Sequence, residues 1–210
     1  MNPLARSSST SLPRTSSLLD KLRHATTEIH DRLHGNPRLT KLLNAHFSLQ
    51  NYLCVLSAFY KFHLGAETFF RDAKPRFEHE ARCLSWLKRD LHFFGHSIPC
   101  RAESLADTRT ILPSFDSYIG YLYVKQGSTL GAQVLGNAIR RHRLSDAGEG
   151  MEYFNGFGRD TAARWRDFID FLSDHEKYVN EEQAAASARH FFLDIEYQLN
   201  QNDQTFIGQH

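Results

Sequence analysis

Two segments of this 210-residue sequence carry residue types and spacings that could do chemistry. One is Gly127-Ser-Thr-Leu-Gly131-Ala-Gln-Val-Leu-Gly136, a glycine-rich stretch inside a long helical pattern. Each glycine within a helix costs about 1 kcal/mol relative to alanine. Gly127 and Gly131 share one face because they are four residues apart. Such a face either permits a close helix–helix crossing or leaves bare backbone for a flat ligand, and both interpretations stay open.

The other segment centres on His30, at the edge of an apolar helical stripe that includes Leu22 and Thr26. A neutral imidazole there could present one nitrogen to a metal in an apolar pocket. The alternative is a histidine that merely lies at the boundary of the core. His34, one turn further on, is either a hydrogen-bond partner of such a ligand or a solvated residue.

Several other chemistries are disfavoured. The sequence has no CxxC, HExxH, GxSxG or GxxxxGK[ST] motif, which removes the commonest zinc, hydrolase and nucleotide sites. Lys and Arg number 25 against 24 Asp and Glu, and this balance argues against a nucleic-acid-binding protein. A di-iron oxidase needs inward-facing Glu-x-x-His pairs. Glu28 and His30 are only two residues apart and therefore point to different faces.

The elements that position these residues are helical almost throughout. Tyr118–Val124 has strand propensity, but one helical face continues through it, so we expect helix there. Ser114 is the expected N-cap of that helix, and Gly35 and Gly95 are expected helix stops. We therefore predict an all-α fold, with helices at about residues 18–34, 49–72, 77–94, 115–142, 159–174 and 181–201.

One folded domain is expected over residues 17–200. Residues 1–16 form a Ser-rich tail without an apolar period, and residues 201–210 form a polar C-terminal tail. Charged residues or glycines interrupt every apolar run well before the length of a membrane span, and the N-terminus lacks the apolar segment of a secretory signal. The three cysteines, Cys54, Cys83 and Cys100, cannot all pair internally. A cytoplasmic location is the simplest interpretation.

Both chemical segments resemble motifs of the heme oxygenase family. Leu22-Arg-His-Ala-Thr-Thr-Glu-Ile-His30, followed by Leu33 and Pro37, resembles the proximal-helix motif, in which the last histidine ligates haem iron. Gly127-Ser-Thr-Leu-Gly131-Ala-Gln-Val134 resembles the glycine-rich distal helix, in the form closest to the bacterial, biliverdin-producing branch associated with phytochromes. Three further stretches resemble the family in the same order: 87–95, 154–168 and 191–195.

The resemblance implies a single-domain, multi-helical bundle with haem between the first helix and the distal helix. The implied reaction is cleavage of haem b at a meso carbon to biliverdin, ferrous iron and carbon monoxide. It consumes O2 and electrons from an external donor such as a ferredoxin, a flavin reductase or ascorbate. The implied partners are haem, a redox protein and a bacteriophytochrome that accepts biliverdin, with no nucleic acid and no membrane.

The resemblance also implies residue roles on both faces of the haem. Gly127, Ser128 and Gly131 would form the catalytic distal surface. Ser128 stands where animal-type members carry an aspartate that orders proton-delivering waters, so protons would need another route. The resemblance also makes His63 a candidate distal hydrogen-bonding residue. Lys125 is three residues from Ser128, and this spacing alone makes it a candidate member of an exposed cationic rim.

On the proximal side, the resemblance makes His30 the iron ligand. Arg23, Arg164 and Arg166 match usually basic positions that would face the haem propionates, and Thr27 replaces a familiar lysine at the cofactor edge. The uncharged Ser128 keeps one alternative open, a haem carrier or sensor that does not open the ring. A non-haem di-iron oxidase on the same fold is the other alternative.

Overall fold

The computed structural model describes residues 17–44, 47–98, 111–141 and 149–201, and every regular element within these ranges is helical. The all-α prediction is therefore confirmed for the described part of the chain. The elements are α1 (Leu18–His34), α2 (Pro37–Leu43), α3 (Leu49–Phe69), α4 (Cys83–Phe93), α5 (Phe115–Arg140), α6 (Glu152–Asn155), η2 (Gly158–Asp160), α7 (Thr161–His175), η3 (Glu176–Tyr178) and α8 (Glu181–Asn200). Both predicted tails lie outside the described residues, apart from Gln201.

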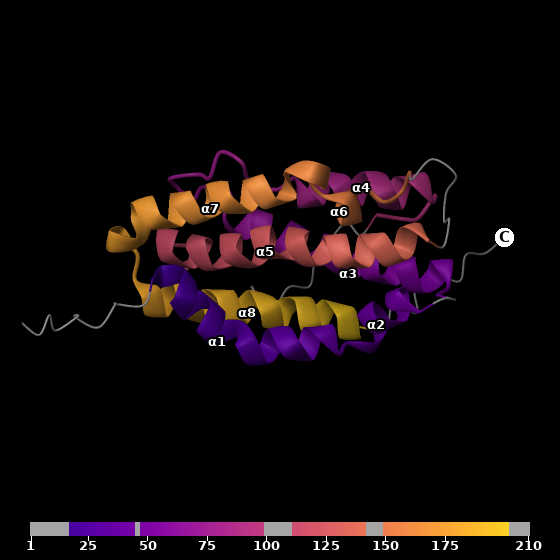
Figure 1. Ribbon diagram of the computed structural model, residues 1–210, viewed down its shortest axis with the longest axis horizontal. Helices are drawn as coiled ribbons and strands as arrows, with labels where there is room; N and C mark the ends of the chain where they lie inside the picture. Colours follow the sequence, from indigo (N-terminus) through magenta and orange to yellow (C-terminus); the bar gives the residue numbers. More distant parts are fainter. Residues whose placement is uncertain (1–16, 45–46, 99–110, 142–148, 202–210) are drawn as a thin grey trace, which may run out of the picture.

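Helix α5 is the central element of the fold. It runs along the middle of the molecule, with α7 on one side and α8 and α1 on the other (Figure 1). Ser114 and Ser117 form a reciprocal capping box at its start, as the sequence pattern indicates. Residues 118–124 are helical and largely buried, because α5 is covered on several sides. This burial explains why the segment is rich in the aromatic and β-branched residues that also favour strands.

Helix α1 begins and ends where the sequence predicts, but the segment that follows it is helical and not a simple connection. The Ser17 hydroxyl accepts the backbone N–H of Asp20, and the helix stops at His34. The residues after it do not form a simple stop, because Pro37 begins the short helix α2. The Asn36 side chain caps α2 by accepting the N–H of Arg38 at 3.0 Å. Proline is favoured at the first position of a helix, where its missing N–H is not needed.

Helix α4 starts later than predicted, at Cys83 instead of about Phe77. The Phe77 N–H donates to the Tyr118 hydroxyl at 3.4 Å, and that hydroxyl donates to Glu80 at 2.9 Å. These bonds from α5 hold the segment before α4 in a non-helical path. Gly95 then ends α4 with a positive φ of 63°, as its position predicts.

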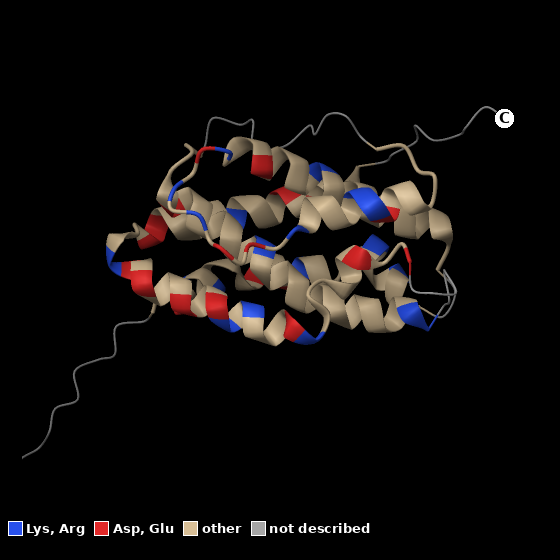
Figure 2. Cartoon of the chain, turned by 90° about the horizontal axis from the view of Figure 1, so that it is seen from above, with Lys and Arg blue, Asp and Glu red and all other residues tan. Residues whose placement is uncertain are grey.

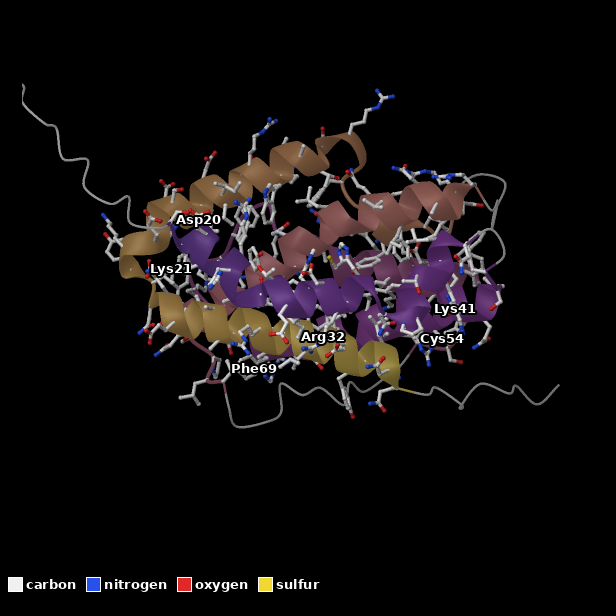
Figure 3. The ribbon with its side chains drawn as sticks, turned by 60° about the horizontal axis from the view of Figure 1, so that its bottom comes forward. Asp20, Lys21, Arg32, Lys41, Cys54 and Phe69 are labelled. Atoms are coloured by element: carbon white, nitrogen blue, oxygen red, sulfur yellow. The ribbon has the colours of Figure 1, made fainter. Side chains whose placement is uncertain are left out.

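Close helix packing forms the core beneath the site. A Cβ on Gly120 of α5 would stand 2.3 Å from the Ala184 carbonyl oxygen of α8, so only glycine permits this crossing. Helix α1 lies alongside α8, and Lys21 and Arg32 are spaced along it (Figure 3). Arg32 donates to Glu196 of α8 at 3.0 and 2.7 Å. Helices α1 and α5 are thus both anchored on α8.

The surface carries mixed charge. Lys and Arg side chains alternate with Asp and Glu over several helices instead of covering one face in this view (Figure 2). In the part of the chain that the structure describes, no helix combines the length and apolar character required to cross a bilayer.

Candidate functional site

A cavity of about 540 Å³ opens between α1 and α5. Its floor and walls also receive side chains from α2, α3, α6, α7 and α8. Most of the lining is apolar or aromatic, which suits a largely hydrophobic ligand. The lining residues are Arg23, His30, Leu33, His34, Leu39, Leu43, Phe59, Tyr123, Gly127, Ser128, Leu130, Gly131, Ala132, Val134, Leu135, Tyr153, Phe154, Trp165, Phe192 and Ile195.

The sequence left two roles open for the glycines of α5, close helix packing and bare backbone facing a ligand, and the structure shows both. A Cβ on Gly131 would meet nothing within 4 Å, and one on Gly127 would meet only Trp165, at 3.8 Å. Both glycines line the cavity and leave backbone bare toward it. Gly136 instead permits close packing, because a Cβ there would lie 2.7 Å from the Phe154 carbonyl oxygen.

His30 faces the same cavity from α1. Its ring lies 4.3 Å from that of His34, centroid to centroid, and 5.9 Å from that of Phe192, edge to face. Burial, followed by the nearby His34, lowers the pKa of His30 below its ordinary value. The imidazole is therefore neutral at pH 7 and keeps a nitrogen lone pair for a metal.

Ser128 lies between the two cavity glycines and lines the cavity. Its hydroxyl donates to the backbone carbonyl of Lys125 at 2.7 Å. The hydroxyl proton is thus bound within the helix, and the oxygen lone pairs remain to accept a hydrogen bond.

The expectation that Lys125 lies on an exposed rim is wrong. The residue is 2% exposed, and its ammonium group lies 2.7 Å from Glu67 and 2.8 Å from Glu80. Although burial opposes the charge, Glu80 and Glu67 together raise the pKa of Lys125 above its ordinary value. Surrounding helices and the segment before α4 cover this side of α5, so its lysine faces the interior.

The expected cationic residues do not all meet at the cavity. Arg23 lines it, whereas Thr27 is exposed and donates to the Arg23 backbone carbonyl at 2.8 Å. Arg164 donates to Asp167 at 3.0 Å, and Arg166 is exposed. Neither arginine lines the cavity, but Trp165 between them does. Consecutive helical residues point about 100° apart, so a helix that turns Trp165 inward turns its neighbours aside.

Sequence reasoning did not identify the aromatic residues that shape the cavity walls. Trp165 lies beside Gly127, Tyr123 projects from α5, and Tyr153 lies on the one-turn helix α6. Phe154 lies in the core, Phe192 packs against it, and both also line the cavity. Their spacing marks a buried helix face but cannot separate a core contact from a cavity wall.

The arrangement fits a haem. Bare backbone at Gly127 and Gly131 leaves room for a flat plate, and the neutral imidazole of His30 supplies a donor that iron accepts. Arg23 adds a positive charge for a carboxylate at the plate's edge. Among the described residues, no group of three or more His, Cys, Asp or Glu side chains could hold a bare metal ion.

Comparisons with known proteins agree on one family. The family model described as heme oxygenase matches residues 16–194. The structure of heme oxygenase from Leptospira interrogans superposes with a TM-score of 0.69 at 18% identity, covering 88% of this chain and 98% of that one. The NO- and CO-bound heme oxygenase from Neisseria meningitidis gives 0.62 at 21% identity, covering 88% and 91%. At these identities the structural likeness shows the fold. Comparison with curated proteins gives no match.

Proposed function

The chain belongs to the heme oxygenase family and degrades haem, and we propose that haem b binds between His30 and the bare backbone of Gly127 and Gly131. The observation that carries this assignment is the open space in front of Gly131, in the cavity that also receives a neutral imidazole. A destabilising glycine face on a central helix has a reason only if something occupies that space.

Each part of the cavity has a role in the proposed reaction. When bound, haem supplies both the iron that activates O2 and the meso carbon that is oxidised. His30 would hold the iron from α1, and the bare glycine backbone of α5 would leave room for the flat ring on the other side. Arg23 would pair with a carboxylate at the edge of the ring. The apolar lining excludes bulk water and so protects the reaction from competing chemistry.

We propose biliverdin, ferrous iron and carbon monoxide as the products. Electrons would come from an external donor, such as a ferredoxin, a flavin reductase or ascorbate, through a redox partner protein. The sequence of the distal helix, Gly127–Val134, supports a place in the phytochrome-associated bacterial branch, with a bacteriophytochrome as acceptor. Cys54 and Cys83 are both free thiols, which supports a reducing, cytoplasmic location.

Hemin titration of a pair of α1 variants tests the assignment. The unmodified protein should bind one hemin with a strong Soret band, and reductant under air should convert that band to the spectrum of biliverdin. His30→Ala should lose the native Soret spectrum. His24→Ala is the matched control, because His24 is exposed on the same helix and does not line the cavity. An unchanged spectrum in His30→Ala would refute the ligand assignment.

A haem carrier or sensor is the second candidate. It is favoured by Ser128, whose uncharged hydroxyl is already bonded to its own helix. Under this alternative, reductant and air would leave a stable ferrous haem complex and no biliverdin band. No observation favours the di-iron alternative.

A further inference from the structure

The end of the molecule that is formed by α2, the start of α3 and the end of α5 combines basic residues with a lack of acidic ones. The sequence has no Asp or Glu between Asp31 and Glu67, and none between Asp116 and Asp146. Helix α2 is therefore free of acidic side chains, as are α3 before Glu67 and α5 after Asp116. Because α2 packs against both α3 and α5, these segments lie together at one end of the bundle (Figure 1).

Four basic residues on these segments form what we call the cationic end: Arg38, Lys41, Arg140 and Arg141. All are exposed except Arg38, which is half-buried. Figure 3 shows Lys41 at the opposite end of the molecule from Asp20 and Lys21. The cationic end is therefore distinct from the first turns of α1, where Arg23 lines the cavity.

The positive charge of the cationic end is not neutralised within the described part of the chain. Arg38 donates to the Gln201 backbone carbonyl at 2.9 Å. Arg141 donates to the Asn137 backbone carbonyl at 3.3 Å, and Arg140 donates to asparagine side chains on α5 and α6. These acceptors are uncharged, and among the described residues none of the four basic groups forms an ion pair with a carboxylate.

Glu152 of α6 and Glu196 of α8 do not supply the missing counter-charge. Glu152 pairs with Arg89 of α4, and Glu196 pairs with Arg32 of α1. The cationic end therefore keeps a positive field that extends into the solvent and attracts an acidic partner.

The cavity reaches the surface beside the cationic end. Leu43 of α2 and Val134 of α5 line the cavity, and they are 50% and 65% exposed. Leu43 is two residues from Lys41, and Val134 lies two helical turns before Arg141. An apolar centre bordered by charged side chains is typical of protein–protein interfaces. A protein docked here would lie directly beside a ring bound in the cavity.

Charge and position together indicate which partner fits this surface. A second copy of the chain would bring like charges together, and this opposes association. The proposed reaction takes electrons from an external donor, which must come close to the bound ring. Electron-transfer partners meet through small, weak interfaces in which complementary charge guides the encounter.

We propose that the cationic end, together with Leu43 and Val134, is the docking surface for an acidic protein that donates one electron at a time. The inference rests on the proposed function, because it places the electron donor of that reaction. Each encounter transfers one electron from the reduced donor to the bound haem, and no bond forms or breaks. The oxidised donor then leaves, because exposed charges hold it only weakly.

The first test measures binding of the hemin complex to an acidic plant-type [2Fe–2S] ferredoxin by isothermal titration. For the unmodified protein, affinity should fall about tenfold or more between about 0.01 M and about 0.15 M NaCl, because the Debye length shortens from about 30 Å to about 8 Å. The double variant Lys41→Glu/Arg141→Glu should bind about tenfold or more weakly at low salt. Absence of binding by the unmodified protein would overturn the proposal.

The matched control is the double variant Arg71→Glu/Lys177→Glu, which changes the total charge by the same amount. Both residues are exposed at the other end of the molecule. Arg71 follows the far end of α3, and Lys177 lies in η3, which contacts the start of α1 through Glu176. The control should bind ferredoxin as the unmodified protein does. Equal weakening in both double variants would show that total charge decides the affinity, and the docking surface would then be wrong.

The second test follows electron delivery without ring opening, as formation of the ferrous carbon monoxide complex in the absence of O2. With reduced ferredoxin, the rate should fall about tenfold or more in Lys41→Glu/Arg141→Glu and stay unchanged in the control. Dithionite should reduce all three proteins equally, because none of the four substituted residues lines the cavity. An unchanged ferredoxin rate in Lys41→Glu/Arg141→Glu overturns the inference. Intact electron delivery without biliverdin formation under air overturns the proposed function instead.

Two further measurements test other occupants of the surface. The hemin complex should not sediment with vesicles of phosphatidylcholine and phosphatidylserine at physiological salt, and it should remain monomeric in sedimentation velocity. Vesicle binding that is lost in Lys41→Glu/Arg141→Glu would assign the surface to an anionic membrane and overturn the proposal. A dimer that is lost in the same variant would assign it to a second copy of the chain, with the same consequence.

Discussion

Alanine at two glycines of α5 should have opposite effects, because only one of them faces open space. A Cβ on Gly131 meets nothing within 4 Å, whereas a Cβ on Gly136 lies 2.7 Å from a backbone oxygen of Phe154. Gly131→Ala should therefore stabilise the protein without haem. Gly136→Ala should destabilise it, although both substitutions have the same effect on intrinsic helix propensity.

The magnitudes follow from propensity and packing. Replacing an interior helical glycine by alanine gains about 1 kcal/mol, and for a chain of this size that raises Tm by about 2–4 °C. Overpacking costs about 1–3 kcal/mol. Because the obstacle at Gly136 is backbone, which cannot rotate away, we expect a net loss of stability there and a Tm lower by several degrees.

Hemin binding should respond in the other direction at Gly131. The added methyl group occupies space that the plate needs, and a penalty of about 1–3 kcal/mol corresponds to roughly 5- to 150-fold weaker binding. Gly131→Leu should abolish binding. Gly136→Ala should bind hemin nearly as tightly as the unmodified protein at temperatures where it is folded, because Gly136 does not line the cavity.

Thermal melting without haem and Soret titration with hemin measure the two effects independently. A lower melting temperature for Gly131→Ala than for the unmodified protein would show that the space in front of this glycine is filled. A more stable Gly131→Ala that binds hemin with unchanged affinity would show that haem does not lie against α5.

Three further predictions concern buried or cavity groups. Lys125→Met should lower the unfolding free energy by about 3–5 kcal/mol, measured by urea denaturation, because Glu67 and Glu80 lose their buried counter-charge. Burial raises the pKa of Asp90 from 3.8 to about 6, so folding favours the protonated carboxyl group. The stability gained in this way is fully present below pH 3.8 and is lost as the pH rises through 6. Asp90→Asn should remove this part of the pH dependence of Tm. Trp165→Ala should weaken hemin binding, measured by Soret titration, because Trp165 lines the cavity beside Gly127; unchanged affinity in the variant would contradict the cavity assignment.

The sequence predicted those features that depend on local chemistry. Ser114 is a helix cap whose side chain bonds within one turn, so it could be identified without the fold. At the first helix the sequence offers both Ser16 and Ser17 as caps, and the structure shows that Ser17 is the N-cap. The helical period through Tyr118–Val124 was also sufficient to decide against a strand. Helix α2 was not predicted, because Pro37 is compatible both with the end of one helix and with the start of the next.

Features that depend on distant segments could not be predicted in the same way. Phe77 lies outside α4 because it bonds to Tyr118, which is 41 residues away in the sequence. Arg164 and Arg166 match basic positions of the family, but the rotation of α7 about its axis brings Trp165 to the cavity in their place. That rotation is set by packing against α5, which a sequence pattern does not contain.

The helical period of α5 explains how one helix can line the cavity on one face and carry the buried ion pairs of Lys125 with Glu67 and Glu80 on another. Positions 123, 127 and 131 follow one another at four-residue steps and line the cavity. Lys125 is two residues out of phase with Gly127, so it points about 200° away, into the cover formed by Glu67 and Glu80. Ser128 is one residue after Gly127 and three after Lys125, so it lies at the border between the two faces, where its hydroxyl bonds to the Lys125 carbonyl. Ser128 is therefore close both to the proposed haem site and to the backbone of the buried Lys125. Because serine supplies no charge there, the protons that the proposed reaction consumes must come from another group or from water.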